Sequence, residues 1–213
     1  MLTGRDDILA EIEARKISAI IRTDDQSVAA DAMNAAIKGG FQMVEFTLTT
    51  PGAFELISEF RKSDDNLLVG AGTVMTVDQA REAVNAGAQF IVSPICDAEV
   101  IVEAKKLSVV SIPGTSTATE METAHKVGAD FVKLFPAPTD IPAYISAILG
   151  PMPYLKIFPT NGVDLDNMLD VLRAGAAGVG FVNPLFHPRD LKAGDFTAVQ
   201  ECASIICERL GIL

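Results

Sequence analysis

FVKLFPA, residues 131–137, is the stretch that decides the fold. Alternate residues of a β-strand point to opposite faces, so Phe131, Lys133 and Phe135 share one face while the Val and Leu between them share the other. Both faces are apolar apart from the lysine, which predicts a strand buried inside the protein. The lysine must then reach a cavity mouth, join an ion pair or take part in chemistry.

Seven other runs rich in Val, Ile, Phe and Thr resemble this strand. They are ISAIIR (17–22), MVEFTLT (43–49), LLVGAGTV (67–74), FIVSPIC (90–96), SVVSIPG (108–114), YLKIFPT (154–160) and GVGFVN (178–183). Segments with helical spacing of apolar residues lie between them, and the strand starts are roughly two dozen residues apart, about the minimum for a parallel crossover unit. Eight units, with no GxGxxG turn after the first strand, favour an α/β (β/α)8 TIM barrel over an open doubly wound sheet.

We expect residues 1–213 to form a single (β/α)8-barrel domain, because 213 residues leave little room for a second one. Residues 4–15 predict an extra N-terminal helix over the bottom of the barrel, and residues 193–210 predict the closing helix. The chain is 49% hydrophobic and 21% charged, as in ordinary globular proteins.

The net charge of -11 argues against nucleic acid or an anionic membrane as a partner. The charged N-terminal segment does not resemble a signal peptide, and no apolar run is long enough to cross a bilayer, so a cytoplasmic protein is expected. The three cysteines, Cys96, Cys202 and Cys207, form no CxxC pair and are interpreted as free thiols. His125 and His187 lack any metal-binding pattern, so neither a metal nor another cofactor is expected.

Two ionisable residues that we expect to point into the interior are the catalytic candidates. Desolvation lowers the pKa of a lysine such as Lys133 and frees its amine to attack a carbonyl carbon. Glu45 shares its face with Thr47 and Thr49, opposite an apolar face, which suggests a polar cavity in which a carboxylate could move protons. The alternative is a buried Glu45–Lys133 ion pair with no chemistry.

Other predicted strands end in GAGT (70–73), SPI (93–95), PGTST (113–117) and FPTNG (158–162), which suit backbone approach to a small anion. With VEFTLTT and FVKLFPA, these motifs resemble, in order and spacing and over nearly the whole chain, the 2-keto-3-deoxy-6-phosphogluconate (KDPG) and 4-hydroxy-2-oxoglutarate (KHG) aldolases. These are class I enzymes of the pyruvate type, which commonly assemble as homotrimers.

The resemblance implies roles for particular residues. Lys133 matches the Schiff-base lysine and Glu45 the general acid/base. Thr73, with the main chain near Pro94 and Gly114, matches the pocket for the carboxylate and keto oxygen of pyruvate. The remaining substrate-binding candidates are Arg22, Thr47, Thr49, Thr115, Thr160, Asn161, Gly162 and Asn183.

The chain departs from the family pattern in two places. Thr49 stands where the family usually has an arginine, and Arg22 matches an arginine of the galactonate-type branch that could substitute. Asn161 replaces a glycine of the phosphate pocket, and Val182 and Asn183 occupy its Gly-Ser region, which restricts the backbone and adds bulk. Whether the substrate is phosphorylated therefore stays open.

The expected reaction is retro-aldol cleavage of a 2-keto-4-hydroxy acid to pyruvate and an aldehyde, either glyceraldehyde 3-phosphate or glyoxylate. One alternative is a keto-acid decarboxylase of the oxaloacetate type, which would use the same lysine. The other is a non-catalytic barrel that binds a small carboxylate.

Overall fold

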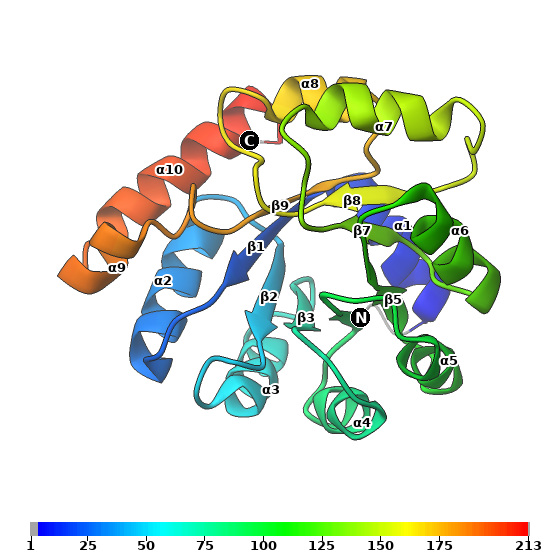
Figure 1. The fold of residues 1–213 in the computed structure, drawn as a ribbon. Helices are drawn as coiled ribbons and strands as arrows, with labels where there is room; N and C mark the ends of the chain where they lie inside the picture. The colour runs from blue at the N-terminus through cyan, green and yellow to red at the C-terminus, as the bar shows by residue number, and fades with distance from the viewer. Residues whose placement is uncertain (1–3, 213) are drawn as a thin grey trace.

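The computed structural model describes residues 4–212, in which helices surround a curled sheet of parallel strands (Figure 1). The strands are β1 (Ile17–Ile21), β2 (Met43–Thr47), β3 (Leu68–Gly72), β4 (Phe90–Val92), β5 (Val110–Ile112), β6 (Gly114–Thr115), β7 (Val132–Leu134), β8 (Ile157–Pro159) and β9 (Val179–Phe181). The helices are α1 (Arg5–Arg15), α2 (Gln26–Lys38), α3 (Ala53–Ser63), α4 (Val77–Asn85), α5 (Ala98–Lys106), α6 (Ala118–Val127), α7 (Ile141–Leu149), α8 (Met168–Arg173), α9 (Pro188–Ala193) and α10 (Phe196–Arg209). The α/β class is confirmed, while residues 1–3 and 213 of the predicted domain lie outside the described residues.

The curled sheet consists of two hydrogen-bonded parts. One part has six strands in the order β5-β4-β3-β2-β1-β9, and the other has three in the order β6-β7-β8. An isolated parallel bridge pairs Thr160, after β8, with Gly180 of β9. The single strand expected over residues 108–114 is instead split into β5 and β6 at Pro113. Proline has no N–H to give to a ladder, although the carbonyl of Pro113 still accepts from the amide of Lys133 at 2.8 Å.

The N-terminal helix α1 packs against side chains from one face of the strands. Its Ile8 and Ile12 are buried in one cluster with Phe90, Phe131 and Phe158. The rings of Phe131 and Phe158 meet edge to face, with 6.3 Å between their centroids. The helix predicted over residues 4–15 is thus present and contributes to the core.

The opposite faces of the strands pack against the helices. Val44 and Phe46 of β2 and Val132 and Leu134 of β7 belong to this second, larger cluster. The helices α2 and α10, from opposite ends of the chain, lie side by side in Figure 1. The alternation predicted for the FVKLFPA and VEFTLT strands is therefore correct, since Lys133 and Glu45 point away from this cluster.

Polar residues at the ends of strands begin the helices that follow. Asp25 caps α2, and Thr117 and Glu120 form a reciprocal capping box at the start of α6. Gly128 ends α6 in the left-handed conformation that glycine adopts most easily. Within residues 4–212, no helix combines the length and the apolar character needed to cross a membrane.

Candidate active site

Lys133 lies in the middle of β7, between Gly114 of β6 and Phe158 of β8. It is only 8% exposed, and its Nζ lies 5.2 Å from the centroid of the Phe135 ring. Burial lowers the pKa of the Lys133 ammonium. The negative charge of Glu45 acts in the opposite direction, and the positive charge of Arg22 lowers the pKa further. The amine is thus more available as a nucleophile than that of a surface lysine.

Glu45, on β2, is 2% exposed. Burial raises the pKa of its carboxyl group, while the charges of Lys133 and Arg22 act in the opposite direction. The carboxylate fits because Gly72 on β3 has no side chain: a Cβ there would lie 2.0 Å from Oε1 of Glu45. A carboxyl group whose pKa is shifted toward neutrality is suited to both giving and taking protons.

Glu45 and Lys133 affect each other's pKa without forming an ion pair within residues 4–212. Each appears among the causes of the other's pKa shift, yet they form no ion pair among the residues that the structure describes. The alternative of a buried Glu45–Lys133 ion pair is therefore not what the structure contains. A buried lysine and a buried carboxyl group with perturbed pKa values are candidates for catalytic roles.

A hydrogen bond joins the ends of two strands at the mouth of the site. Nη2 of Arg22, directly after β1, donates to Oγ1 of Thr73, directly after β3, at 3.0 Å. Thr73 has a φ of 60°, a left-handed conformation that costs a β-branched residue about 1–2 kcal/mol. The sequence GAGT predicted a functional turn but gave no sign of this strained threonine or of its contact with Arg22.

The threonines after β2 form a cluster of hydroxyl groups. Oγ1 of buried Thr47 lies 3.1 Å from Oγ1 of Thr49 and 3.3 Å from that of Thr50. Thr50 also accepts a hydrogen bond from the amide of Thr23 at 3.4 Å. Thr49 is exposed and has no positive charge, so it cannot replace the arginine that the family usually has at this position. Arg22, which contacts Thr73, is the candidate for that role. Sequence reasoning did not single out Thr50.

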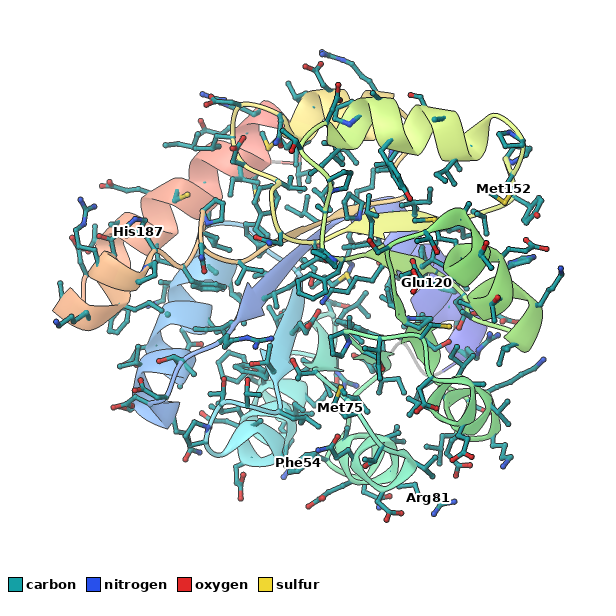
Figure 2. The ribbon with its side chains drawn as sticks, in the orientation of Figure 1. Phe54, Met75, Arg81, Glu120, Met152 and His187 are labelled. Atoms are coloured by element: carbon teal, nitrogen blue, oxygen red, sulfur yellow. The ribbon has the colours of Figure 1, made fainter. Side chains whose placement is uncertain are left out.

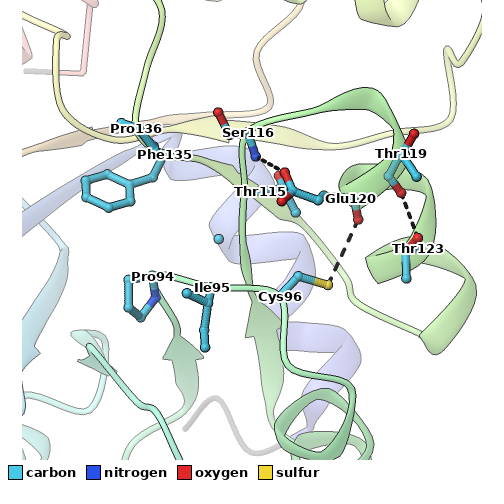
Figure 3. A pocket seen from close by; sticks show the side chains of 11 residues that line it. Pro94, Ile95, Cys96, Thr115, Ser116, Thr119, Glu120, Thr123, Phe135 and Pro136 are labelled. Carbon is cyan, nitrogen blue, oxygen red and sulfur yellow. Dashed lines mark hydrogen bonds between the residues drawn. The ribbon is translucent and has the colours of Figure 1, made fainter.

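A cavity of about 450 Å³ opens beside the end of β7 (Figure 3). Pro94 and Ile95 face Phe135 across it, and Gly114 and Thr115 form part of its wall. A Cβ on Gly114 would lie 2.2 Å from the backbone of Pro94, so glycine lets these two strand ends approach. The Thr115 hydroxyl donates to the carbonyl oxygen of Lys133 at 3.0 Å, and it therefore orients β7.

A second cavity, of about 530 Å³, lies at the ends of β1 and β9. Its wall contains Arg22, Asp24, Asp25, Asn183 and Lys192, together with apolar residues of α2 and α9. The side chains of Lys133 and Glu45 line neither cavity. The first cavity is lined by Phe135, whose ring lies near the Lys133 amine. The second cavity is lined by Arg22, whose charge affects the pKa of Lys133.

The loop after β8 keeps the conformation that a glycine pair would allow. Asn161 has a φ of 75° and Gly162 a φ of 77°, both left-handed. Asparagine tolerates the left-handed region better than other residues with a Cβ, so this loop conformation is available to Asn161. The restriction and bulk expected from Asn161 at a phosphate site stay a prediction. Thr160 is buried, whereas Asn161 and Gly162 are exposed. Val182 is half-buried and Asn183 exposed at the other strand end.

Among residues 4–212, neither histidine forms a hydrogen bond or a ring contact with a candidate site residue. The His125 ring packs on Tyr154, with 4.9 Å between centroids, and His187 lies beside α9 at the edge of the molecule (Figure 2), where its Nδ1 accepts from the Arg189 amide. The part of the chain that the structure describes contains no group of three or more His, Cys, Asp and Glu arranged to hold a metal ion.

Comparison with known proteins agrees with this geometry. The family model for KDPG and KHG aldolase matches residues 8–202. The 2-dehydro-3-deoxy-phosphogluconate aldolase of Treponema pallidum is 32% identical over 210 residues, 97% of this chain and 99% of the relative. The 2-dehydro-3-deoxy-6-phosphogalactonate aldolase of Escherichia coli K12 is 35% identical over 173 residues, 79% of this chain and 83% of the relative.

A solved structure extends the comparison to three dimensions. The KDPG aldolase of Legionella pneumophila, with pyruvate captured at low pH as a covalent carbinolamine intermediate, has a TM-score of 0.82 and 27% identity. The match covers 95% of this chain and 97% of that chain. The family model and the long, similarly sized relatives lead to one conclusion: this chain belongs to the KDPG and KHG aldolase family.

Proposed function

We propose that this protein is a metal-independent class I aldolase that cleaves a 2-keto-4-hydroxy acid to pyruvate and an aldehyde. One observation carries the proposal: a buried lysine with a lowered pKa shares an interior with a buried carboxyl group with a raised pKa, without an ion pair between them. The amine is not neutralised by an ion pair with the carboxyl group, so it can act as a nucleophile while the carboxyl group exchanges protons.

Lys133 is the proposed nucleophile. Its neutral amine adds to the C2 carbonyl carbon to give a carbinolamine, and loss of water gives an iminium. Cleavage of the C3–C4 bond then sends the bonding electrons into the iminium, so that an enamine of pyruvate remains and the aldehyde leaves. Protonation of the enamine at C3 and hydrolysis release pyruvate and restore the amine.

Glu45 is the proposed acid/base. It protonates the departing hydroxyl of the carbinolamine, takes the proton of the C4 hydroxyl as the C3–C4 bond breaks, and returns a proton to C3. A raised pKa suits this cycle, because the carboxyl group must be easily protonated and easily deprotonated at neutral pH.

The substrate is proposed to resemble 2-keto-3-deoxygluconate or its galactonate epimer, with or without a 6-phosphate, or 4-hydroxy-2-oxoglutarate. The aldehyde released is glyceraldehyde 3-phosphate from a phosphorylated sugar acid, glyceraldehyde from an unphosphorylated one, and glyoxylate from 4-hydroxy-2-oxoglutarate. The names of the relatives support the sugar-acid type. Arg22 and Thr73 would hold the carboxylate of the keto acid, beside the main chain of Pro94 and Gly114. Further candidate contacts come from Thr47, Thr49, Thr115, Thr160, Asn161, Gly162 and Asn183.

We further propose that the sheet closes into a complete (β/α)8 barrel, one domain with α1 over its lower end. The strand order and the Thr160–Gly180 bridge support closure, and Ile8 and Ile12 of α1 support the position of the helix. A homotrimer and a cytoplasmic location remain proposals that rest on the family resemblance and on the free cysteines. Light scattering coupled to size-exclusion chromatography measures the assembly.

The test of the mechanism is reduction of the protein with borohydride in the presence of pyruvate, followed by peptide mass spectrometry. We expect a reduced pyruvyl adduct on Lys133 and none in Lys133→Met. Lys156→Met is the matched control, because Lys156 also lies over an aromatic ring, at 5.6 Å from the Phe131 centroid, but it is more exposed and paired with Glu13. This variant should keep the adduct.

Two outcomes would contradict the proposal. Absence of an adduct with any keto acid would favour a barrel that only binds a carboxylate. An adduct accompanied by carbon dioxide release from oxaloacetate, without aldehyde release from any 2-keto-4-hydroxy acid, would favour a decarboxylase.

A further inference from the structure

The backbone of Lys133 is held by its short neighbouring strand, β6, and by the residue before it. The amide of Lys133 donates to the carbonyl of Pro113 at 2.8 Å, and the carbonyl of Lys133 accepts from the Thr115 hydroxyl at 3.0 Å. Two residues along β7, the amide of Phe135 donates to the carbonyl of Thr115 at 3.0 Å. The position of the nucleophile therefore depends on where residues 113–115 lie.

β6 is a short edge strand. It has two residues and lies at the edge of the three-stranded part of the sheet, because the sheet is interrupted at Pro113 between β5 and β6. Toward the end of β4, the amide of Gly114 donates to the carbonyl of Ile95 at 3.2 Å, which is a long hydrogen bond. Since strands usually have five or six residues, we expect side chains from other elements to help fix a strand this short.

Two side chains hold the peptide groups of Ser116, the residue directly after β6. The Glu120 carboxylate of α6 accepts from the amide of Ser116 at 2.8 Å (Figure 3) and from that of Thr117 at 2.9 Å. The Tyr144 hydroxyl of α7 donates to the carbonyl of Ser116 at 2.7 Å. Because the half-buried ring of Tyr144 packs against the core, this bond ties the loop to a fixed point.

Tyr144 thus joins the helix that follows the Lys133 strand to the loop that follows the neighbouring strand. The helix itself is anchored by the buried side chains of Ile141 and Ile145. We propose that Tyr144 is a positioning residue for the nucleophile: it holds the Ser116 carbonyl, which fixes β6, and β6 fixes the backbone of Lys133. The inference rests on the aldolase function proposed above and adds a residue that acts on the amine through another strand.

The test measures how fast the pyruvyl adduct forms on Lys133, with borohydride added at timed intervals, and divides this rate by the number of sites trapped at completion. Tyr144→Phe removes only the hydroxyl and should slow adduct formation per site by on the order of fivefold, since a displacement of about 1 Å can slow such a step about a hundredfold. Dividing by the trapped sites removes the effect of any unfolded fraction, which is what a purely structural role would change.

Tyr154→Phe is the matched control. The Tyr154 hydroxyl also makes a 2.7 Å hydrogen bond, to the Glu122 carboxylate, but Tyr154 is exposed and this bond does not involve β6. The control should form the adduct at the wild-type rate.

An unchanged rate per site in Tyr144→Phe would overturn the inference, as would an equal loss in Tyr154→Phe. The same experiment separates the two levels of the argument. If the wild-type protein forms the adduct and Tyr144→Phe forms it equally fast, the role of Tyr144 is wrong and the aldolase function stands. If the wild-type protein forms no adduct with any keto acid, the proposed function itself is wrong.

Discussion

A Cβ on Gly72 would lie 2.0 Å from Oε1 of Glu45, so the position of this carboxylate depends on the missing side chain of a residue on the neighbouring strand. Gly72 pairs with Thr47, two residues beyond Glu45 on β2. The glycine is therefore a part of the site that supplies space rather than a functional group.

Gly72→Ala should displace the Glu45 carboxylate and lower kcat by at least about tenfold, because proton transfer requires close positioning. Pyruvate should still be trapped on Lys133, since the lysine lies on a different strand. Gly150→Ala is the control: its Cβ would meet nothing closer than 3.6 Å. Steady-state kinetics would contradict the prediction if both variants kept wild-type kcat.

Thr73→Val should raise the KM for the keto acid by about tenfold, because Arg22 loses the acceptor that orients it and hydrogen bonds to charged groups contribute about 1.5–3 kcal/mol. Thr73→Ser keeps the hydroxyl and should behave like the wild type. In Arg22→Gln, adding Thr73→Val should cause little further loss. Equal KM values for Thr73→Val and the wild type would disprove the link between the two residues.

Glu45→Gln should stabilise the protein in a pH-dependent way. Because burial raises the pKa of Glu45, the folded protein binds a proton at pH values where the unfolded chain has released it, and stability falls as pH rises through this window. The variant lacks this ionisation, so its advantage in Tm should be small near pH 4 and reach roughly 2–4 °C at neutral pH and above. Calorimetry with the exposed Glu59→Gln as control tests this, and a constant difference across pH would refute it.

Asp130→Ala should destabilise the protein without changing its kinetics at low temperature. Asp130 pairs with Arg5 of α1 and accepts from the amide of Ser111 at 3.0 Å, so its removal leaves two donors without their partner. The free energy of unfolding should fall by about 2 kcal/mol. Asp130→Asn keeps an acceptor for Ser111 and should lose less. Urea denaturation measures both variants. An unchanged free energy of unfolding in Asp130→Ala would contradict the prediction that these two interactions stabilise the protein.

The sequence determined the parts of this protein that depend on local periodicity. Alternation along FVKLFPA and VEFTLT placed Lys133 and Glu45 on the inner faces of their strands, and the structure has both side chains buried there. The same repetition predicted the strands and the α/β class, and the motifs identified the family. These features persist because each depends only on neighbours within one element.

Tertiary structure alone decided how distant segments meet. The space at Gly72 for Glu45, the bond between Arg22 and Thr73 and the left-handed backbone of Asn161 all depend on the relative positions of strand ends and loops. The hydrogen bond from the Thr115 hydroxyl to the Lys133 carbonyl oxygen also depends on how β6 and β7 pair. A sequence lists which groups are present, whereas strand pairing and loop closure fix their separations, and these separations determine both charge and chemistry.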